Sequence, residues 1–482
     1  MNKYKSVRFN FLMNFILTIS NFIFPLLTFP YASRVLMASG VGTVSFAMSI
    51  ISYFSMIGML GIPTYGIRAS AKVRDDKEKL EKIVQEIVII NMSVMFFAIV
   101  ALAITVLSVE RLRDEKLLYL IMSSTLLFNV LGVDWLYKAL EKYTYITIRS
   151  VIFKLLSLIL LFLFIKNPED YILYGAITVF AGVGSNLMNF INLRKLIKLK
   201  PMKNLAFKHH IKPIFTFFLL TVSTTIYLNV NTTLLGFMRN DEAVGYYSAA
   251  VKVKQILVSI VTSLGVVLLP RLSFFYEKGE LEKFNKLTQK ALNFILLISL
   301  PLMSFFIIVA KEIIIFLAGP SFFPSVFVMQ IIMPTILLIG LSNLMGIQIL
   351  VPSNRENLVV ISTIFGAIVD IIVNVFTIPL WGVAGAGIAS TLAELTVVCV
   401  QLFFLKSFIF PIFKRIKINK IIISNLIALI ITFFLKNFLT VDNFFILVIS
   451  SIIFFSVYVL CLLIFKEEFS FDLSKSLLSK LR

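Results

Sequence analysis

The chain has 482 residues, of which 59% are hydrophobic and only 15% charged, and its formal net charge is +20. So few polar side chains cannot cover the surface of a soluble globule of this length, which excludes a water-soluble protein. Its two cysteines lie in apolar segments and indicate neither a disulfide framework nor a thiolate metal site.

Apolar runs of about 20 residues, the length that crosses a bilayer as a helix, recur along the whole chain. Backbone groups that face lipid are satisfied only within helices, so the predicted fold is an all-α, polytopic membrane protein. Six segments are predicted first: 7–31, 40–65, 83–108, 117–136, 145–165 and 171–193. After a basic linker, six more follow: 211–238, 243–269, 287–309, 325–351, 357–380 and 382–405. Segments 421–438 and 444–465 bring the prediction to about fourteen transmembrane helices.

Residues at the start of the second segment recur 203 positions later, at the start of the eighth. Val41, Gly42, Ser45 and Ala47 reappear as Val244, Gly245, Ser248 and Ala250, and Arg68 reappears as Arg271. The repeat predicts two pseudo-symmetric six-helix halves, residues 1–200 and 201–410. Residues 411–482 would then hold two additional helices and a cytoplasmic tail.

The positive charge is distributed unevenly along the chain. If both termini are cytoplasmic, the loops on that side and the adjoining helix ends hold 34 of the 45 Lys and Arg residues, as the positive-inside rule requires. The clusters at 68–82, 194–212 and 406–420 carry no interleaved aromatic platform. We therefore expect them to set topology and contact anionic lipid headgroups rather than nucleic acid. His209 and His210 are expected to be solvated residues of the inner linker, with a pH-sensing hinge as the alternative.

Polar residues form stripes on the first two helices of each half. They recur at helical spacing in Asn14, Thr18 and Asn21, in Ser45, Ser49 and Ser52, in Ser248, Gln255 and Ser259, and at Asn229. Lipid tails cannot pair these groups, so each faces either another helix or water. Taken together, the stripes predict a polar cavity between the halves, although helix packing explains any one of them.

Ionised side chains within the bilayer are costly and mark transport pathways by default. Lys252 is predicted near the midplane and to face the cavity, together with Lys154 and Arg149. Lys254 lies about 200° further round the helix, which favours a helix-contact or snorkelling role.

Two carboxylates, Asp370 and Glu394, are predicted at similar depth. Such a pair shares a proton, binds a cation or pairs with a Lys residue. Asn374 and Thr391 lie one helical turn from them and would add oxygen ligands. A cation-coupling site and plain salt bridges to Lys154, Lys252 or Lys254 both remain open. No nucleophile-base pair, phosphate-cradling loop or metal-ligand spacing is present in the sequence, which indicates a protein that is not an enzyme.

The chain contains four features in a fixed order and spacing: the duplicated halves, the V-G-x-x-S-x-A repeat, D-Y-I-L-Y-G from Asp170 and W-G-V-A-G-A-G from Trp381. In this order and spacing they resemble the Wzx-type polysaccharide repeat-unit flippases of the multidrug/oligosaccharidyl-lipid/polysaccharide exporter superfamily. The resemblance covers nearly the whole chain. It implies that the protein moves oligosaccharide units linked to undecaprenyl pyrophosphate from the inner to the outer leaflet of the bacterial plasma (inner) membrane by alternating access.

The implied products are surface polysaccharides such as capsule, O-antigen or exopolysaccharide. The implied partners are the lipid-linked glycan, the bilayer, and the polymerase and chain-length machinery of the same pathway, and the protein is expected to be a monomer. In related lipid II flippases a sodium site lies on helices seven, eleven and twelve. Asn231, Asp370, Asn374 and Thr391 stand in comparable places here. Because Asn231 replaces the relatives' carboxylate, coupling to H⁺, to Na⁺ or to neither stays open; no cofactor or resident metal is expected.

Two alternative functions fit these residues less well. A cation-coupled multidrug antiporter of the same superfamily would need an acidic cavity for its cationic cargo, which Lys252 and Lys154 oppose. A membrane polysaccharide polymerase would need a sizeable catalytic loop, whereas the longest loop is the basic linker at 194–212, which lacks acidic metal-binding pairs.

Overall fold

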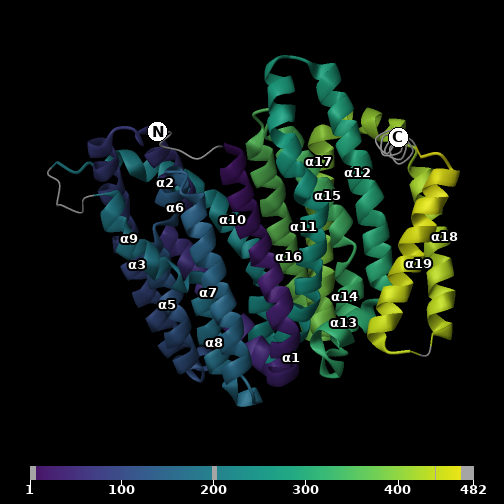
Figure 1. The fold of residues 1–482 in the computed structure, drawn as a ribbon, viewed down its shortest axis with the longest axis horizontal. Helices are drawn as coiled ribbons and strands as arrows, with labels where there is room; N and C mark the ends of the chain where they lie inside the picture. The colour runs from purple at the N-terminus through teal and green to yellow at the C-terminus, as the bar shows by residue number, and fades with distance from the viewer. Residues whose placement is uncertain (1–6, 198–203, 440, 468–482) are drawn as a thin grey trace. The chain divides into compact units, whose positions relative to one another are not determined.

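A computed structural model describes residues 7–197, 204–439 and 441–467, and every regular element within these ranges is helical (Figure 1). The chain divides by its internal contacts into two compact units, residues 1–245 and 246–482. These units are defined by contacts, so they do not test the division predicted from the sequence repeat. The halves 1–200 and 201–410 stay a prediction. Each unit is described by itself below.

The first unit holds the helices up to the start of α11. Its elements are α1 (Val7–Met59), α2 (Ile62–Lys72), α3 (Lys77–Ser108), α4 (Glu110–Arg113), α5 (Lys116–Gly132), α6 (Asp134–Ala139), α7 (Tyr143–Phe164), η1 (Pro168–Asp170), α8 (Tyr171–Val179), η2 (Phe180–Gly184), α9 (Asn186–Leu196) and α10 (Lys208–Met238). Helix α1 packs against α3, α5, α7 and α10, so it forms the centre of this unit.

The second unit begins within α11 (Asp241–Glu277). It continues with α12 (Leu281–Ile308), α13 (Ala310–Ala318), η3 (Pro320–Phe322), α14 (Ser325–Ile332), α15 (Thr335–Asn343), η4 (Leu344–Leu350), α16 (Glu356–Trp381), α17 (Val383–Arg415), α18 (Ile418–Phe438) and α19 (Asn443–Ile464). Figure 1 shows α18 and α19, in yellow, as a hairpin, and they pack on α12 and α13 respectively.

The described residues contain 13 helices that are long and apolar enough to cross a membrane. All fourteen predicted segments overlap these spans, because segments 7–31 and 40–65 share one of them, Phe9–Lys72. The polytopic all-α prediction is therefore confirmed. The separate start of the second segment is not observed, since α1 continues through it.

Helix α1 changes direction at Met37 instead of ending in a loop. Met37 has φ 60° and ψ −174°, far from helical values, and Pro25 and Pro30 precede it. Each proline removes one backbone hydrogen bond, which favours bending in this part of the helix. The helix finally ends at Met59, where Leu60 and Gly61 both adopt positive φ.

A close helical hairpin joins α16 to α17 through Gly382, which has φ 55°. Gly385 lies so near the end of α16 that an added Cβ would approach the Thr377 carbonyl oxygen to 2.3 Å. The Thr377 hydroxyl donates a hydrogen bond to the Gly385 carbonyl at 3.0 Å. Gly382 and Gly385 of the W-G-V-A-G-A-G motif are thus needed for this tight crossing. Helix α16, which carries Asp370, therefore packs along α17, which carries Glu394.

Candidate functional site

Lys154 of α7 is held by polar residues of α1. Its ammonium donates hydrogen bonds to the Ser20 hydroxyl, at 2.8 Å, and to the Asn21 side-chain oxygen. The residue is only 7% exposed, and its Nζ lies 6.0 Å from the centre of the Phe24 ring. The structure therefore brings together two residues predicted for the cavity, Lys154 and Asn21. Ser20 was missed because it lies off the predicted stripe.

Arg149 lies one and a half turns earlier on α7 and belongs to a different cluster. Its guanidinium donates to the Ser185 hydroxyl at 2.7 Å, to the Asn186 side-chain oxygen at 3.1 Å and to Asp134. Asn189 donates to the same Asp134 oxygen at 2.6 Å. Arg149 is 7% exposed, so this cation is already surrounded by fixed acceptors.

The backbone explains how Asp134 reaches Arg149. Val133 adopts φ 38° and ψ 37°, a left-handed conformation that is unusual for a β-branched residue, and it separates α5 from α6. Gly132 just before it has no room for a side chain, since a Cβ would lie 2.5 Å from Asn186. The sequence offered one signal for this cluster, three polar residues close together in an apolar segment. They are Ser185, Asn186 and Asn189.

The predicted polar stripe of the first half divides into buried and exposed members. Ser49 is 2% exposed; it donates to the Phe46 carbonyl at 2.7 Å and accepts from Thr233 of α10 at 3.0 Å. It therefore takes part in helix packing. Ser45 and Ser52 are half-buried, whereas Asn14 and Thr18 are exposed.

The polar residues of the second repeat are more accessible. Gln255 is exposed, and Ser248, Lys252, Ser259 and Asn229 are half-buried. Part of their hydrogen-bonding capacity goes to their own helices: Asn229 donates to the Thr225 carbonyl at 2.9 Å, and Ser259 to the Ile256 carbonyl at 2.6 Å.

A charged group in the second unit contains the two predicted carboxylates. Asp370 is 1% and Glu394 6% exposed, and Asn374 donates to Asp370 Oδ1 at 3.0 Å. The charges of both carboxylates act on Lys254 and on Tyr247, and Tyr247 also bonds the Ser390 side chain. Lys254 thus lies in the electrostatic field of both carboxylates, and the choice between a cation-coupling site and salt bridges stays open. Tyr247 and Ser390 were missed by the sequence analysis.

Two further residues were predicted for the coupling site, Thr391 and Asn231. The Thr391 hydroxyl donates to the backbone carbonyls of Ile331, at 2.9 Å, and Gly387, at 3.0 Å. Asn231 is 5% exposed and lies on α10 in the first unit, whereas Asp370 and Asn374 belong to the second.

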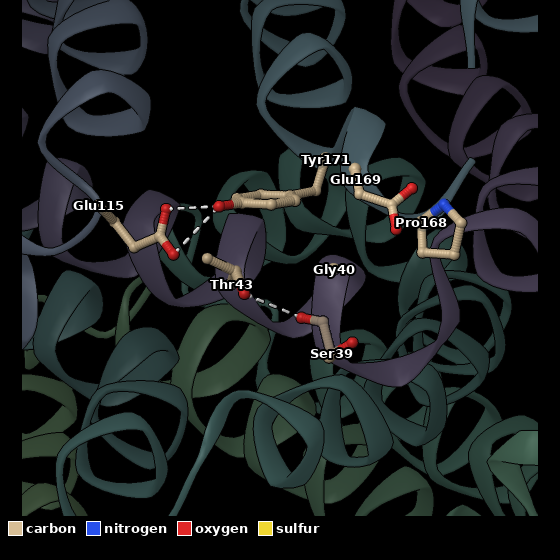
Figure 2. A pocket seen from close by; sticks show the side chains of 7 residues that line it. All are labelled: Ser39, Gly40, Thr43, Glu115, Pro168, Glu169 and Tyr171. Carbon is tan, nitrogen blue, oxygen red and sulfur yellow. Dashed lines mark hydrogen bonds between the residues drawn. The ribbon is translucent and has the colours of Figure 1, made fainter. Parts of the chain in front are cut away.

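A small pocket of about 220 Å³ opens in the first unit, where residues of α1, the start of α5 and the start of α8 meet (Figure 2). It is lined by Ser39, Gly40, Thr43, Glu115, Pro168, Glu169 and Tyr171. Figure 2 shows the Tyr171 hydroxyl pointing at Glu115, to which it donates at 2.9 Å. Because Glu115 and Glu169 line this pocket, it is unsuited to an anionic group.

Comparison with known proteins places this arrangement in a family. The chain is 24% identical over 353 residues to a protein of Escherichia coli K12 named "Putative O-antigen transporter", covering 70% of this chain and 81% of that one. A protein of the same name from Shigella dysenteriae is 27% identical over 271 residues, covering 55% and 67%. These relatives are named as transporters, in agreement with the prediction of a protein that is not an enzyme.

Solved structures share the fold. The lipid II flippase MurJ in an inward closed conformation superposes with a TM-score of 0.75 at 18% identity, covering 94% of this chain and 98% of that one. An inward-facing multidrug resistance MATE family transporter of the MOP superfamily gives 0.63 at 12% identity, covering 81% and 95%. Residues 7–275, more than half of the chain, match the model of the polysaccharide biosynthesis protein family. The protein is a member of that family, with the fold of the MOP-superfamily exporters.

Proposed function

We propose that the protein flips lipid-linked oligosaccharide units across the bacterial plasma membrane for the assembly of a surface polysaccharide. Family membership over residues 7–275 is the observation that carries this proposal. The lipid II flippase fold, which extends over 94% of the chain, supports it, as does the name of the Escherichia coli relative. The family match favours this activity over multidrug export, and the relatives' names as transporters favour it over a polymerase.

The cargo proposed is a glycan on undecaprenyl pyrophosphate. A pyrophosphate carries at least two negative charges, and its transfer through a medium of low dielectric constant requires fixed cations along a hydrated path. Lys252, half-buried on a helix with polar neighbours, is the residue proposed to receive it. Lys154 and Arg149 are more enclosed: Lys154 is proposed to supply a further positive charge to the path, and Arg149 to hold the first unit's polar interior in place. Exposed amides such as Gln255 would bond the sugar hydroxyls.

The polyprenyl tail would stay in lipid. The α18–α19 hairpin presents large apolar side chains, among them Phe434, Phe438 and Ile464, which are 60%, 79% and 72% exposed. Such a surface suits contact with acyl or polyprenyl chains. We propose that it guides the tail.

We further propose alternating access with both termini cytoplasmic. Duplicated bundles commonly reorient about a midplane site, which gives each side access in turn. The excess of Lys and Arg in the loops on one side supports the orientation. The cargo must bind the two orientations with different affinity for any ion gradient to drive the cycle.

Replacement of Lys252 tests the proposal. The host strain is deleted for its own gene and complemented with wild type, Lys252→Ala, Lys252→Arg or the exposed control Lys286→Ala. Surface polymer, lipid-linked intermediates and membrane protein amount are then measured. We expect Lys252→Ala to abolish surface polymer and to accumulate lipid-linked units at normal protein amount, with partial function in Lys252→Arg. Normal export by Lys252→Ala would remove Lys252 from the path, and normal polymer in the deletion strain would refute the function.

A further inference from the structure

Two adjacent histidines of the basic linker meet a carboxylate from a distant part of the first unit. Glu86 lies on α3, and His209 and His210 lie in the first turn of α10. Glu86 Oε2 is 2.8 Å from His210 Nε2 and 3.9 Å from His209 Nε2, and the three ligand atoms all lie within 4.8 Å of one another. In the part of the chain that the structure describes, no other group of three His, Cys, Asp or Glu residues meets this condition.

The histidines do not have the environment expected from the sequence. His210 is 1% exposed and hydrogen-bonded, so the prediction of a solvated loop residue is wrong for it. His209 has a side chain 55% exposed and agrees with that prediction. Both lie on a helix, and their ring centres are 3.8 Å apart. Adjacent helical residues normally diverge by about 100°, so their convergence on one carboxylate is specific to this site.

Further hydrogen bonds hold the two buried members in position. The Tyr65 hydroxyl lies 2.6 Å from His210 Nδ1, and the Ala206 amide donates to Glu86 Oε1 at 2.7 Å. The Ala206 amide thus fixes Glu86 Oε1, which leaves Glu86 Oε2 directed at the two histidines. When His210 Nδ1–H donates to Tyr65, the neutral ring presents the lone pair of Nε2. Partners of this kind orient the ligands of metal sites and raise their basicity.

We propose that Glu86, His209 and His210 bind a single Zn²⁺ ion. Two imidazole nitrogens and one carboxylate oxygen are an established ligand set for Zn²⁺, with a fourth, open position for water. Zn–N and Zn–O bonds of about 2.0–2.2 Å place tetrahedral ligand atoms roughly 3.3–3.5 Å apart. The observed separations of 2.8 and 3.9 Å bracket that value, so small side-chain rotations form the site. The exposed ring of His209 leaves the fourth position open to water.

Zn²⁺ would take the place of the proton between His210 Nε2 and Glu86 Oε2. Without metal, His210 Nε2–H donates to Glu86 and the Tyr65 hydroxyl donates to Nδ1. Binding of Zn²⁺ at Nε2 requires the other neutral tautomer: the single ring proton moves from Nε2 to Nδ1, which then donates to the Tyr65 hydroxyl, and His210 loses no net proton. The bound ion ties the start of α10 to α3, two elements 124 positions apart in sequence. A linkage that forms only in the folded protein stabilises it by mass action.

The chain is well suited to a direct test because His209 and His210 are its only histidines. Full-length protein is purified in detergent through a tag without histidine, stripped with a chelator and titrated with Zn²⁺ in competition with a chromophoric indicator. We expect one equivalent of Zn²⁺ to bind and to raise the thermal unfolding temperature. Co²⁺ should give the visible absorption of a four-coordinate site.

Variants separate this site from binding elsewhere. His209→Ala alters an exposed side chain, so the variant should fold normally. Because it removes a ligand itself, its Zn²⁺ affinity should fall at least about 100-fold, whereas loss of a residue that only hydrogen-bonds a ligand costs about 10–100-fold. Tyr65→Phe keeps the ring and should lose about 10–100-fold. Lys208→Ala, the exposed neighbour, should bind as wild type. The proposal is overturned if wild type binds no equivalent of Zn²⁺ or if His209→Ala binds as tightly as wild type.

Discussion

Gly42 of α1 and Gly245 of α11, which occupy equivalent positions in the two repeats, lie directly against each other. A Cβ built on Gly42 would come within 2.8 Å of the Gly245 amide nitrogen and 1.7 Å of the Asp241 carbonyl oxygen. A Cβ on Gly245 would approach the Ala38 carbonyl oxygen to 2.0 Å. The repeated glycine is therefore a packing requirement, because two backbones meet where no side chain fits.

Substitution of Gly42 should destabilise the protein strongly. Gly42→Ala places a methyl group against backbone, which cannot move aside as a flexible side chain can. We expect a loss of at least about 3 kcal/mol, the upper end of the usual cost of overpacking, seen as less folded protein and a lower unfolding temperature in detergent. Gly182→Ala is the matched control, since nothing lies within 4 Å of its added Cβ. Equal stability of the two variants would contradict this interpretation.

The Arg149–Asp134 pair should contribute mainly to stability. Asp134→Asn leaves the buried guanidinium without its counter-ion, and we expect a loss of about 1–3 kcal/mol. The full cost of breaking a buried pair is not expected, because the Asp134 side chain is 44% exposed. Chemical unfolding of purified protein measures the effect. Glu282→Gln removes a solvent-exposed pair with Lys286 and should cost no more than about 0.5 kcal/mol. A loss in Asp134→Asn no larger than in this control would argue against a structural role.

Lys154 should affect transport more than folding. Methionine at this position is apolar and of similar length, and it avoids the cost of burying an ammonium group. We therefore expect Lys154→Met to be at least as stable as wild type while polymer export falls, because the polar interior near Ser20 and Asn21 loses its cation. Surface polymer and unfolding temperature are measured on the same variant, with Lys283→Met as the exposed control. Full export by Lys154→Met would show that its charge is dispensable.

Coupling through Asp370 and Glu394 should involve protons. Lys254 lies in the field of both carboxylates, and a fixed cation repels a bound Na⁺ but allows a carboxylate to exchange H⁺. In proteoliposomes, we expect flipping of a lipid-linked glycan to follow an imposed pH gradient and to be insensitive to replacement of Na⁺ by choline. Asp370→Asn should abolish the response to the pH gradient. Stimulation of the wild type by a Na⁺ gradient, lost in Asp370→Asn, would instead establish a sodium site.

The sequence by itself determined the helical spans and the family. Hydropathy and helical period act within about 20 neighbouring residues, so predicted segments overlap all 13 apolar spans of the described residues, and the motifs at Gly42 and Trp381 could be identified. The local breaks were harder to predict: Met37 and Val133 adopt positive φ although neither residue type favours it. Their conformations depend on packing with other helices, which local propensity does not contain.

Only the tertiary structure decided which charged groups meet. The pairing of Arg149 with Asp134, and of Glu86 with His210, depends on contacts between helices separated by many residues and on the removal of these groups from water. The same holds for Lys254, two residues from Lys252 in sequence, which lies in the electrostatic field of Asp370 and Glu394. The sequence shows which charged residues lie in apolar segments, where burial of an ion is costly. The partner of each charge is decided by three-dimensional packing, because electrostatic energies in a medium of low dielectric constant depend on separations of a few ångströms.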